Sequence, residues 1–358
     1  MRRRSRRWRN RVVADARDTP DKRVINLALQ GGGTHGAFTW GVLDRLLEDE
    51  RIAIEGISGT SAGAVNAAVL AQGYLKGGAT GARAELDAFW NRLSAIGWLS
   101  PVHRGWLQRV MGTWNIDESP STVWLDQLSH LVSPYQANPL NLSPLRDLLA
   151  GMLDWYALRA RDSIKLFITA TNVRTGKPRI FQRDDLTLDA LLASICLPQY
   201  FQTVVIEGEP YWDGGYMGNP SIWPLIYFCR SSDVVIVQVN PLTRDGVPRT
   251  PAEITNRLNE ITFNASLMRE MRAIFFAERL IEGDAHGPEI DRLKKMLVHM
   301  IEDEEAMKQL GVASKLNTDL DFLLYLKTLG RRTAERWLEK HFSALGHSSS
   351  LDIRKVFL

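Results

Sequence analysis

The sequence predicts an α/β fold with a mostly parallel central sheet, followed by a helical C-terminal region. The apolar segment 24–30 ends in a glycine-rich turn, and a helical pattern follows as far as Asp49. The apolar segment 52–54 also runs into a glycine-containing turn, and residues 62–71, which are rich in Ala, Val and Leu, continue as a helix. This strand–helix–strand–helix order forms right-handed crossovers between parallel strands. Both glycine turns are therefore expected at the carboxyl edge of neighbouring strands.

Length and composition restrict the class of protein. With 358 residues and a hydrophobic fraction of 45%, the chain can bury the core of one large α/β domain or two ordinary ones. Cys196 and Cys229 are its only cysteines, which favours a reducing compartment and predicts a cytoplasmic protein with no disulfide framework and no metal centre. The sequence has no apolar run of the roughly 18 residues that cross a bilayer. We expect a protein that is soluble or peripherally bound to a membrane.

Residues 1–20 form a basic tail. Seven arginines fall within the first eleven residues, whereas the net charge of the whole chain is only +3. The composition predicts a disordered, solvated arm. The alternative is attraction to an anionic membrane, with Trp8 as an interfacial anchor. We expect no nucleic-acid partner, and the oligomeric state is left open.

Ser61 lies within a Gly-x-Ser-x-Gly motif at the second glycine turn. A serine on a sharp turn between a strand and a helix is lifted clear of the sheet, and small neighbours let the strand and the helix approach each other. The N-H groups at the start of the helix favour negative charge beside the hydroxyl. We therefore predict that Ser61 is a nucleophile, held in an elbow formed by Gly59, Thr60, Ala62 and Gly63.

The first glycine turn has two interpretations. Its residues are Gly31, Gly32, Gly33, Thr34, His35 and Gly36, which also fit the Gly-x-Gly-x-x-Gly fingerprint of dinucleotide-binding proteins. That fingerprint requires an acidic residue after the second strand, and Glu55 is the only candidate there. A second glycine turn that carries a raised serine serves no purpose in nucleotide binding. We favour an oxyanion hole, in which unpaired N-H groups of the first turn face the charge that forms when Ser61 attacks a carbonyl.

Residues 90–156 form an insertion rich in tryptophan and proline. They can form a cap that contacts lipid at the water–apolar boundary, or an ordinary packing layer over the sheet, and the sequence favours neither. The tryptophans in question are Trp90, Trp98, Trp106, Trp114, Trp124 and Trp155.

The next segment predicts strands that lead to an aspartate. Residues 164–173 and 179–182 read as strands, residues 186–195 as a helix, and residues 204–206 and 211–212 as the two arms of a hairpin. The hairpin ends in Asp213, Gly214 and Gly215. An Asp-Gly pair is usually a turn between two strands, but this one ends an apolar segment, which indicates that the carboxylate is held for a purpose.

Residues 234–239 are predicted as the last strand, and the C-terminal region, residues 246–358, as helical. Helical patterns cover residues 251–281, 289–310 and 331–345. We interpret the apolar stripe of the second as core, with membrane contact as the alternative. The third is amphipathic and, together with the arginine tail, is a candidate for docking on anionic membrane.

Taken together, these motifs resemble the patatin-like phospholipase family over roughly residues 24–240. The resemblance rests on Gly31–Gly36 as an oxyanion loop, Gly59–Gly63 as a nucleophile elbow and Asp213–Gly215 as an acid motif, in that order. The segment from Ala193 to Phe201 and the pair Asn219-Pro220 are also similar to the family. The resemblance implies a three-layer α/β/α sandwich over residues 21–245.

The same resemblance implies a lipid acyl hydrolase that needs no cofactor or metal. Its nucleophile would be Ser61 and its base Asp213, a Ser–Asp pair in place of a Ser–His–Asp triad, acting through an acyl-enzyme on a lipid or another acyl ester. An ordinary aspartate, with a pKa near 4, is a weak base, so Asp213 must be partly desolvated. The acyl ester that serves as substrate is left open.

The sequence departs from the family at His35, where an arginine or lysine is usual. We expect a supporting role for this histidine, and the alternative is a role at low pH through its protonation. Two other functions are kept: a hydrolase with a Ser61–Asp213–His286 triad, and a dinucleotide-binding or interaction module that uses Gly31–Gly36 without catalysis.

Overall fold

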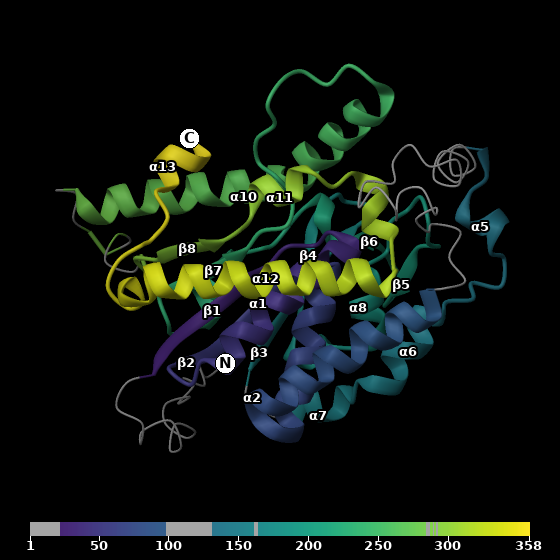
Figure 1. Cartoon of the computed structure of the whole chain (residues 1–358), viewed down its shortest axis with the longest axis horizontal. Coiled ribbons are helices and arrows are strands. Elements are labelled where there is room, and N and C mark those ends of the chain that lie inside the picture. The colour runs from purple at the N-terminus through teal and green to yellow at the C-terminus, as the bar shows by residue number, and fades with distance from the viewer. Residues whose placement is uncertain (1–21, 98–130, 161–163, 284–286, 289, 291–292) are drawn as a thin grey trace, which may run out of the picture.

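The computed structural model describes residues 22–97, 131–160, 164–283, 287–288, 290 and 293–358 (Figure 1). Within these residues lies an eight-stranded sheet with helices on both faces. Its strands are β1 (Arg23–Leu29), β2 (Ile52–Thr60), β3 (Lys165–Asn172), β4 (Pro178–Gln182), β5 (Val204–Ile206), β6 (Glu209–Asp213), β7 (Asp233–Val237) and β8 (Leu297–Ile301).

The centre of the sheet is parallel. The strand order is β5-β6-β3-β2-β1-β7-β8, with β4 also paired to β3. The neighbouring strands β3, β2, β1, β7 and β8 all run in the same direction. Strands β4 and β6 run antiparallel to β3, and β5 runs antiparallel to β6. The predicted α/β fold with a mostly parallel sheet is confirmed, and the carboxyl ends of β1 and β2 lie side by side as expected.

Helices cover both faces of the sheet. The α-helices are α1 (Gly36–Glu48), α2 (Ala62–Gly97), α5 (Pro134–Ala137), α6 (Pro144–Met152), α7 (Trp155–Ala160), α8 (Leu188–Ser194), α9 (Trp223–Phe228), α10 (Pro251–Glu282), α11 (Glu304–Lys308), α12 (Leu320–His341) and α13 (Ile353–Phe357). Helix α2 combines two helices across a kink at Gly77 and Gly78. The remaining short turns are 3-10 helices: η1 (Gly33–His35), η2 (Arg183–Asp185), η3 (Gly214–Tyr216), η4 (Val312–Leu316) and η5 (Phe342–Ala344).

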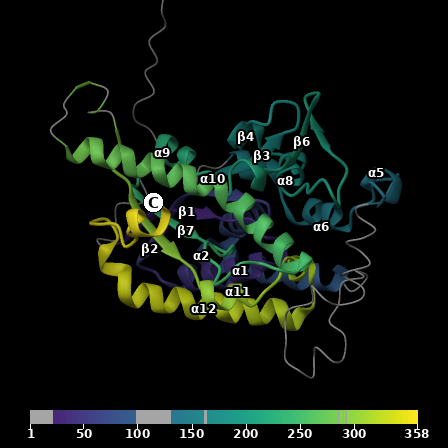
Figure 2. The same ribbon diagram turned by 90° about the horizontal axis from the view of Figure 1, so that it is seen from above.

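The alternation of side chains along the strands produces three layers. In β1, Leu27 and Leu29 join a core formed with α1, α2 and α12, whereas Ala28, between them, faces a second core formed with α9, α10 and α13. Figure 2 shows α10 and α12 on opposite sides of the sheet. The predicted α/β/α sandwich and the helical C-terminal region are therefore observed.

The expectation that every element after residue 239 is helical was wrong. Residues 297–301, which we assigned to a helix over 289–310, form the edge strand β8, parallel to β7. The apolar residues are spaced at three and four positions, which fits a helix. Residues 297–301 also form a short, mostly apolar run, as in a buried parallel strand. Pairing with β7 decides in favour of the strand over the helix. Among the described residues of 289–310, the only helix is the short α11, which follows β8.

The third C-terminal pattern is part of α12, but its apolar face is not available to a membrane. Trp337, Leu338 and Leu345 are buried in the core. Among the described helices, none combines the length and the apolar composition that a membrane crossing needs. The basic tail lies outside the described residues, so the alternatives for it stay open.

About half of the tryptophan-rich insertion also lies outside the described residues, including Trp98, Trp106, Trp114 and Trp124. Two tryptophans of this set are described. Trp90 is 2% exposed and its Nε1 donates to Asn66 at 3.0 Å. Trp155 is partly buried and packs against the same core. For these two residues the structure supports ordinary packing.

Helices α1 and α12 approach closely because glycines face each other across them. A Cβ atom at Gly330 would lie 2.1 Å from the carbonyl oxygen of Phe38, and one at Gly41 would lie 2.0 Å from that of Lys327. Gly330→Ala should therefore force the helices apart and lower the free energy of unfolding by roughly 1–3 kcal/mol. Urea unfolding followed by circular dichroism measures the change.

Gly151→Ala is the matched control. Gly151 also lies in a helix, but nothing lies within 4 Å of the Cβ atom that this substitution adds. The variant should be as stable as the wild type or slightly more stable, since alanine is the better helix former. Equal unfolding free energies for Gly330→Ala and the wild type would contradict the close-packing argument.

Candidate active site

Ser61 occupies a strained turn between β2 and α2. Strand β2 ends at Thr60, α2 begins at Ala62, and Ser61 between them has a φ of 53°, in the left-handed region that non-glycine residues rarely adopt. Its side chain is almost fully buried, and its N-H donates to Ser194 Oγ at 3.0 Å. Backbone strain of this kind persists only when the surroundings enforce it, and it is common at functional sites.

The glycines of the elbow are required by the close approach of the backbone. A Cβ atom at Gly59 would lie 2.6 Å from the Gly63 carbonyl oxygen, and one at Gly63 would lie 2.3 Å from that of Leu29. The side chain of Thr60 is also fixed, since its hydroxyl donates to the Gly218 carbonyl at 2.5 Å. The elbow is therefore locked against β1 by contacts that admit no larger side chain.

Asp213 reaches Ser61 because two strands share one edge of β3. Strand β4 covers one edge of β3 over residues 167–171. Along the other edge, β2 ends with Thr60 opposite Thr169, and β6 comes from the opposite direction and ends with Asp213 opposite Ala170. The two strand ends thus meet head to head. This register brings together a serine and a carboxylate that are far apart in the chain.

The carboxyl group of Asp213 is fully buried, and only one of its two oxygens accepts a hydrogen bond. Its Oδ1 accepts a hydrogen bond from the Gly215 N-H at 2.7 Å, and its Oδ2 has no partner. Burial raises the pKa of Asp213 to about 7, and the Gly215 N-H, the Ser61 hydroxyl and the charge of Lys315 oppose that rise. The Ser61 hydroxyl is thus close enough to act on the carboxyl, although it does not form a hydrogen bond of normal geometry.

The two glycines after Asp213 are also set by packing. A Cβ atom at Gly214 would lie 2.1 Å from the Thr169 carbonyl oxygen, and one at Gly215 would lie 2.4 Å from the ring of Phe263. The acid motif is consequently pressed between β3 and α10, which holds the carboxyl group toward the elbow.

The glycine-rich loop offers N-H groups next to Ser61. A Cβ atom at Gly31 would lie 2.6 Å from that of Ser61, so the two residues are in contact. The Gly31 N-H donates to Asn219 Oδ1 at 2.6 Å and is not available to a ligand. Within the described part of the chain, the N-H groups of Gly32 and Gly33 have no acceptor. These two are the available donors of the loop.

The side chains of Gln30 and Asn240 hold the base of this loop. The amide of Asn240 donates to the Gly31 carbonyl at 2.8 Å and to Gln30 Oε1 at 3.1 Å. Gln30 in turn donates to the carbonyl of Asn219 at 3.2 Å. Both side chains are buried, so the loop rests on a polar layer that fixes its height above the sheet.

His35 supports the loop as a neutral group. The Ser314 hydroxyl donates its hydrogen to the Gly311 carbonyl at 2.6 Å, so it accepts from His35 Nε2 at 2.7 Å. The buried Nδ1 has no partner among the described residues. Burial and then the charge of Lys315 lower the pKa of His35 well below its ordinary value of 6.5. A neutral histidine is in keeping with the expected supporting role, and the alternative of a role at low pH stays a prediction.

Sequence reasoning missed several residues that complete the site. Ser194 and Asn219 fall in segments noted for their resemblance, but we assigned them no role. Ser314 and Lys315 belong to η4, in the C-terminal region, and no sequence motif marks them. Their place beside the glycine loop depends on a long-range contact that a single sequence does not reveal.

The two alternative functions gain no support from the described residues. Glu55, the acidic candidate for a ribose, binds Lys165 Nζ at 2.7 Å and the N-H groups of Arg230 and Ser231, away from the glycine loop. His286, the triad candidate, lies outside the described residues. Among described histidines, the one that pairs with an aspartate is His299, whose Nε2 lies 3.0 Å from Asp233 at the amino end of β7.

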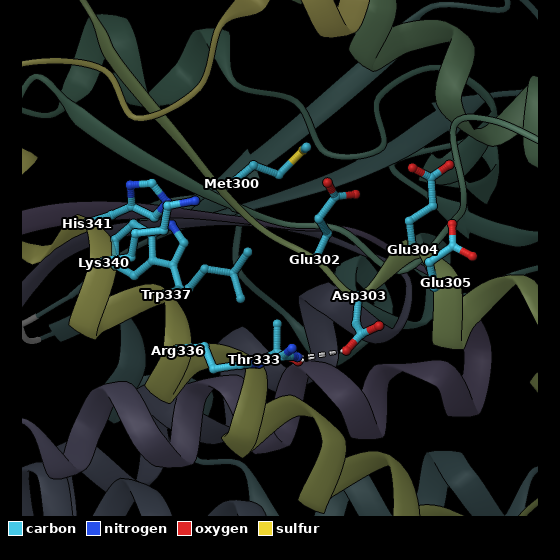
Figure 3. Close-up of a pocket in the computed structure, with 11 residues that line it drawn as sticks. Met300, Glu302, Asp303, Glu304, Glu305, Thr333, Arg336, Trp337, Lys340 and His341 are labelled. Carbon is cyan, nitrogen blue, oxygen red and sulfur yellow. Dashed lines mark hydrogen bonds and ion pairs between the residues drawn. The ribbon is translucent and has the colours of Figure 1, made fainter.

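A cavity of about 410 Å³ lies at a different place, beyond the carboxyl end of β8 (Figure 3). It is lined by the acidic segment 302–305 and by side chains of α12, and Asp303 accepts a hydrogen bond from Arg336 at 2.9 Å. Its lining includes no residue of the glycine loop, the elbow or the acid motif. In the described residues no group of three or more His, Cys, Asp and Glu side chains is arranged to hold a metal ion.

The chain is similar to several known proteins. The model of the family described as patatin-like phospholipase matches residues 27–226, more than half of the chain. Among solved structures, VipD from Legionella pneumophila is similar with a TM-score of 0.36 and 15% identity, over 86% of this chain and 67% of VipD. ExoU in its complex with SpcU, from Pseudomonas aeruginosa, is similar with a TM-score of 0.33 and 18% identity, over 89% of this chain and 52% of that chain. No curated protein sequence matches the chain.

The raised pKa of Asp213 predicts a dependence of stability on pH. Its carboxyl has a pKa of about 7 when folded, against an ordinary value of 3.8. Between these values the folded protein retains a proton that the unfolded chain releases, so wild-type stability falls as pH rises. Asp213→Asn removes this effect. At pH 8 the variant should be more stable than the wild type, by up to about 4 kcal/mol, and the difference should shrink toward pH 4.

Urea unfolding at intervals from pH 4 to pH 8 measures the difference. Asp245→Asn, which changes a side chain that is 94% exposed, is the matched control and should keep the wild-type pH dependence. A stability difference between Asp213→Asn and the wild type that does not change with pH would show that the carboxyl is not buried as described.

Proposed function

The chain belongs to the patatin-like phospholipase family, and on this basis we propose that it hydrolyses lipid acyl esters with Ser61 as nucleophile and Asp213 as base. Membership of the family supports lipid acyl hydrolysis in general. The assignment of the two residues rests on one observation above all: the buried carboxyl group of Asp213, one of whose oxygens has no partner, lies within reach of the hydroxyl of a serine on a strained turn.

In the first step, Ser61 Oγ attacks the carbonyl carbon of the ester while its proton passes to Asp213. An ordinary carboxylate is too weak a base for this transfer at neutral pH. A pKa of about 7 gives Asp213 the proton affinity that general-base catalysis requires near pH 7. The proton then goes to the departing alcohol oxygen as the C–O bond breaks, which leaves an acyl ester on Ser61.

The negative charge on the carbonyl oxygen needs donors that are already in position. The N-H groups of Gly32 and Gly33 are the proposed donors, since the loop holds them beside Ser61 without another acceptor. Two helical segments also begin at this place: one is η1, which continues into α1, and the other is α2. Helix N-termini favour negative charge. The other residues of the predicted oxyanion loop, Gly31 and Thr34 to Gly36, are proposed to shape it.

The second step is hydrolysis of the acyl-enzyme. Water takes the place of the alcohol, and Asp213 accepts a proton from it as the water oxygen attacks the acyl carbon. The proton returns to Ser61 Oγ when the acid is released, so the cycle consumes one water and restores both residues. No histidine, metal or cofactor takes part in the proposed cycle.

The surface near Asp213 is consistent with a lipid substrate. The loop 196–203 contacts Asp213 through the Cys196 carbonyl, and it binds the segment 131–142 through Gln202 and Thr203. That segment exposes large apolar side chains, with Leu131, Leu140 and Leu142 each 70–79% exposed. Exposed apolar side chains of this size suit contact with acyl chains or with a membrane. We propose peripheral contact with lipid here; the identity of the acyl ester and its cleaved position are left open.

The nucleophile assignment predicts a covalent label. A fluorophosphonate probe should react with the folded wild-type protein, because only an activated serine is reactive toward it, and Ser61→Ala should abolish both labelling and ester hydrolysis. Ser58→Ala is the control: Ser58 lies on the same strand, but its hydroxyl is bound to the Ser221 carbonyl. Hydrolysis at the wild-type rate by Ser61→Ala would refute the enzyme assignment and favour a binding module.

The base assignment predicts a loss of turnover without a loss of fold. Asp213→Asn keeps an oxygen that can accept from Gly215 but removes the base, so kcat/KM should fall by about 10²- to 10⁴-fold. His286→Ala is measured in parallel and should retain wild-type hydrolysis. If the histidine variant were the inactive one and the aspartate variant active, the triad would replace the Ser–Asp pair.

A further inference from the structure

The 3-10 helix η4 is fastened to the glycine-rich loop. The Thr34 hydroxyl donates to the Ser314 carbonyl at 2.8 Å. A Cβ atom at Gly33, whose φ is 58°, would lie 2.3 Å from the Lys315 carbonyl oxygen. The backbone of Lys315 therefore touches the loop that carries the proposed oxyanion donors. Lys315 lies outside residues 27–226, the part of the chain that matches the family.

Neutral groups hold the ammonium of Lys315 in place. Its Nζ donates to Asn240 Oδ1 at 2.8 Å and to Asn259 Oδ1 at 2.6 Å, and it lies 5.3 Å from the centre of the Phe263 ring. Two of these three partners also contact the site, because Asn240 binds the Gly31 carbonyl and the Phe263 ring lies against Gly215. The amide oxygens and the ring orient the ammonium but leave its charge without a counterion.

Four other ionisable groups face this charge. Glu260 and Asp213 favour the charged form of Lys315, and Arg244 disfavours it. Glu260 is engaged by Arg244 at 2.5 Å and by Arg257 at 3.2 Å. Burial and the charge of Lys315 itself lower the pKa of His35 well below 6.5, which keeps it neutral. Asp213 is therefore the acid on which the positive charge of Lys315 acts without competition from an ion pair.

We propose that Lys315 is the positioning cation of this site: it acts through Asp213, keeping its carboxyl group ionised and ready to accept the proton of Ser61. This inference rests on the proposed function. It also explains how the site manages without a cation on the glycine loop, where a neutral histidine stands at position 35. The charge comes instead from the C-terminal region, by way of η4.

The proposal has a consequence for the pH dependence of hydrolysis. Activity needs Asp213 deprotonated, and the charge of Lys315 lowers the pH at which this happens. Burial lowers the pKa of Lys315 to about 8, and that of Asp213 is about 7, so the lysine still carries its charge in the range where Asp213 titrates. The activity should therefore rise through a limb near pH 7. Loss of the lysine charge raises the pKa of Asp213, since an opposing cation has been removed.

The test is the pH profile of kcat/KM for a neutral acyl ester, measured on the full chain. In Lys315→Met the rising limb should move up by roughly half to one pH unit, because the cation that favours the ionised form of Asp213 has been removed. The rate at pH 7 should drop roughly two- to fivefold, in kcat and not in KM. In Lys315→Arg the cation is kept, so the rising limb should stay in place.

Lys308→Met is the control. It removes a lysine from the same C-terminal segment whose Nζ is bound to Glu305 at 3.0 Å, and it should leave the rising limb unchanged. If Lys315→Met keeps the wild-type profile while Ser61→Ala and Asp213→Asn are inactive, the role of Lys315 is overturned and the proposed function stands. If Lys315→Met does not fold, the profile of Lys315→Arg decides: a rising limb that moves away from pH 7 although the positive charge is kept overturns the inference. Activity that does not depend on Ser61 overturns the proposed function itself.

Discussion

The positions of Ser61 and Asp213 depend on how two strands, β2 and β6, pair along the same edge of β3. Because β2 and β6 approach along that edge from opposite directions, the last residue of one strand stands next to the last residue of the other. Ser61 directly follows the end of β2 at this junction, and Asp213 is the last residue of β6 there. A shift of one residue in either register would turn the side chains of that strand to the opposite face of the sheet. The hydrogen-bond ladder of β3 thus sets the distance between the two groups more directly than any local feature of the serine turn.

The site contains features that lower the stability of the folded protein, and favourable packing elsewhere in the fold must offset them. Ser61 has a left-handed backbone, Asp213 keeps an unpaired buried oxygen, and the buried amide nitrogen of Asn219 has no partner in the described structure. Each costs on the order of one to a few kcal/mol. These features are tolerated because the cores on both faces of β1 hold the surrounding backbone rigidly. A carboxylate whose ionised form was well stabilised by its surroundings would have a low pKa and would be a poor base.

Much of this could be predicted from the sequence. The strands before and after the two glycine turns follow from short apolar runs, and Ser61 and Asp213 stand out because each ends such a run beside glycine. The failures have physical causes. The segment that forms β8 has a spacing that suits either a helix or a strand, and only the neighbouring β7 decides. Lys315 is a single lysine in a polar stretch, and its significance comes from contacts with Gly33 and Asn240 that no local pattern encodes.

The position of η4 also has a consequence for the order in which the protein is made. The serine, the glycine loop and the aspartate are synthesised first, but Ser314 and Lys315, which brace the loop from behind, leave the ribosome after all of them. A nascent chain that ends before residue 311 contains the proposed nucleophile and the proposed base, but it lacks the hydrogen-bond partner of His35 and the proposed cation, Lys315. The growing polypeptide therefore carries an incomplete site through most of translation, and the site is finished only when the C-terminal region folds back onto it.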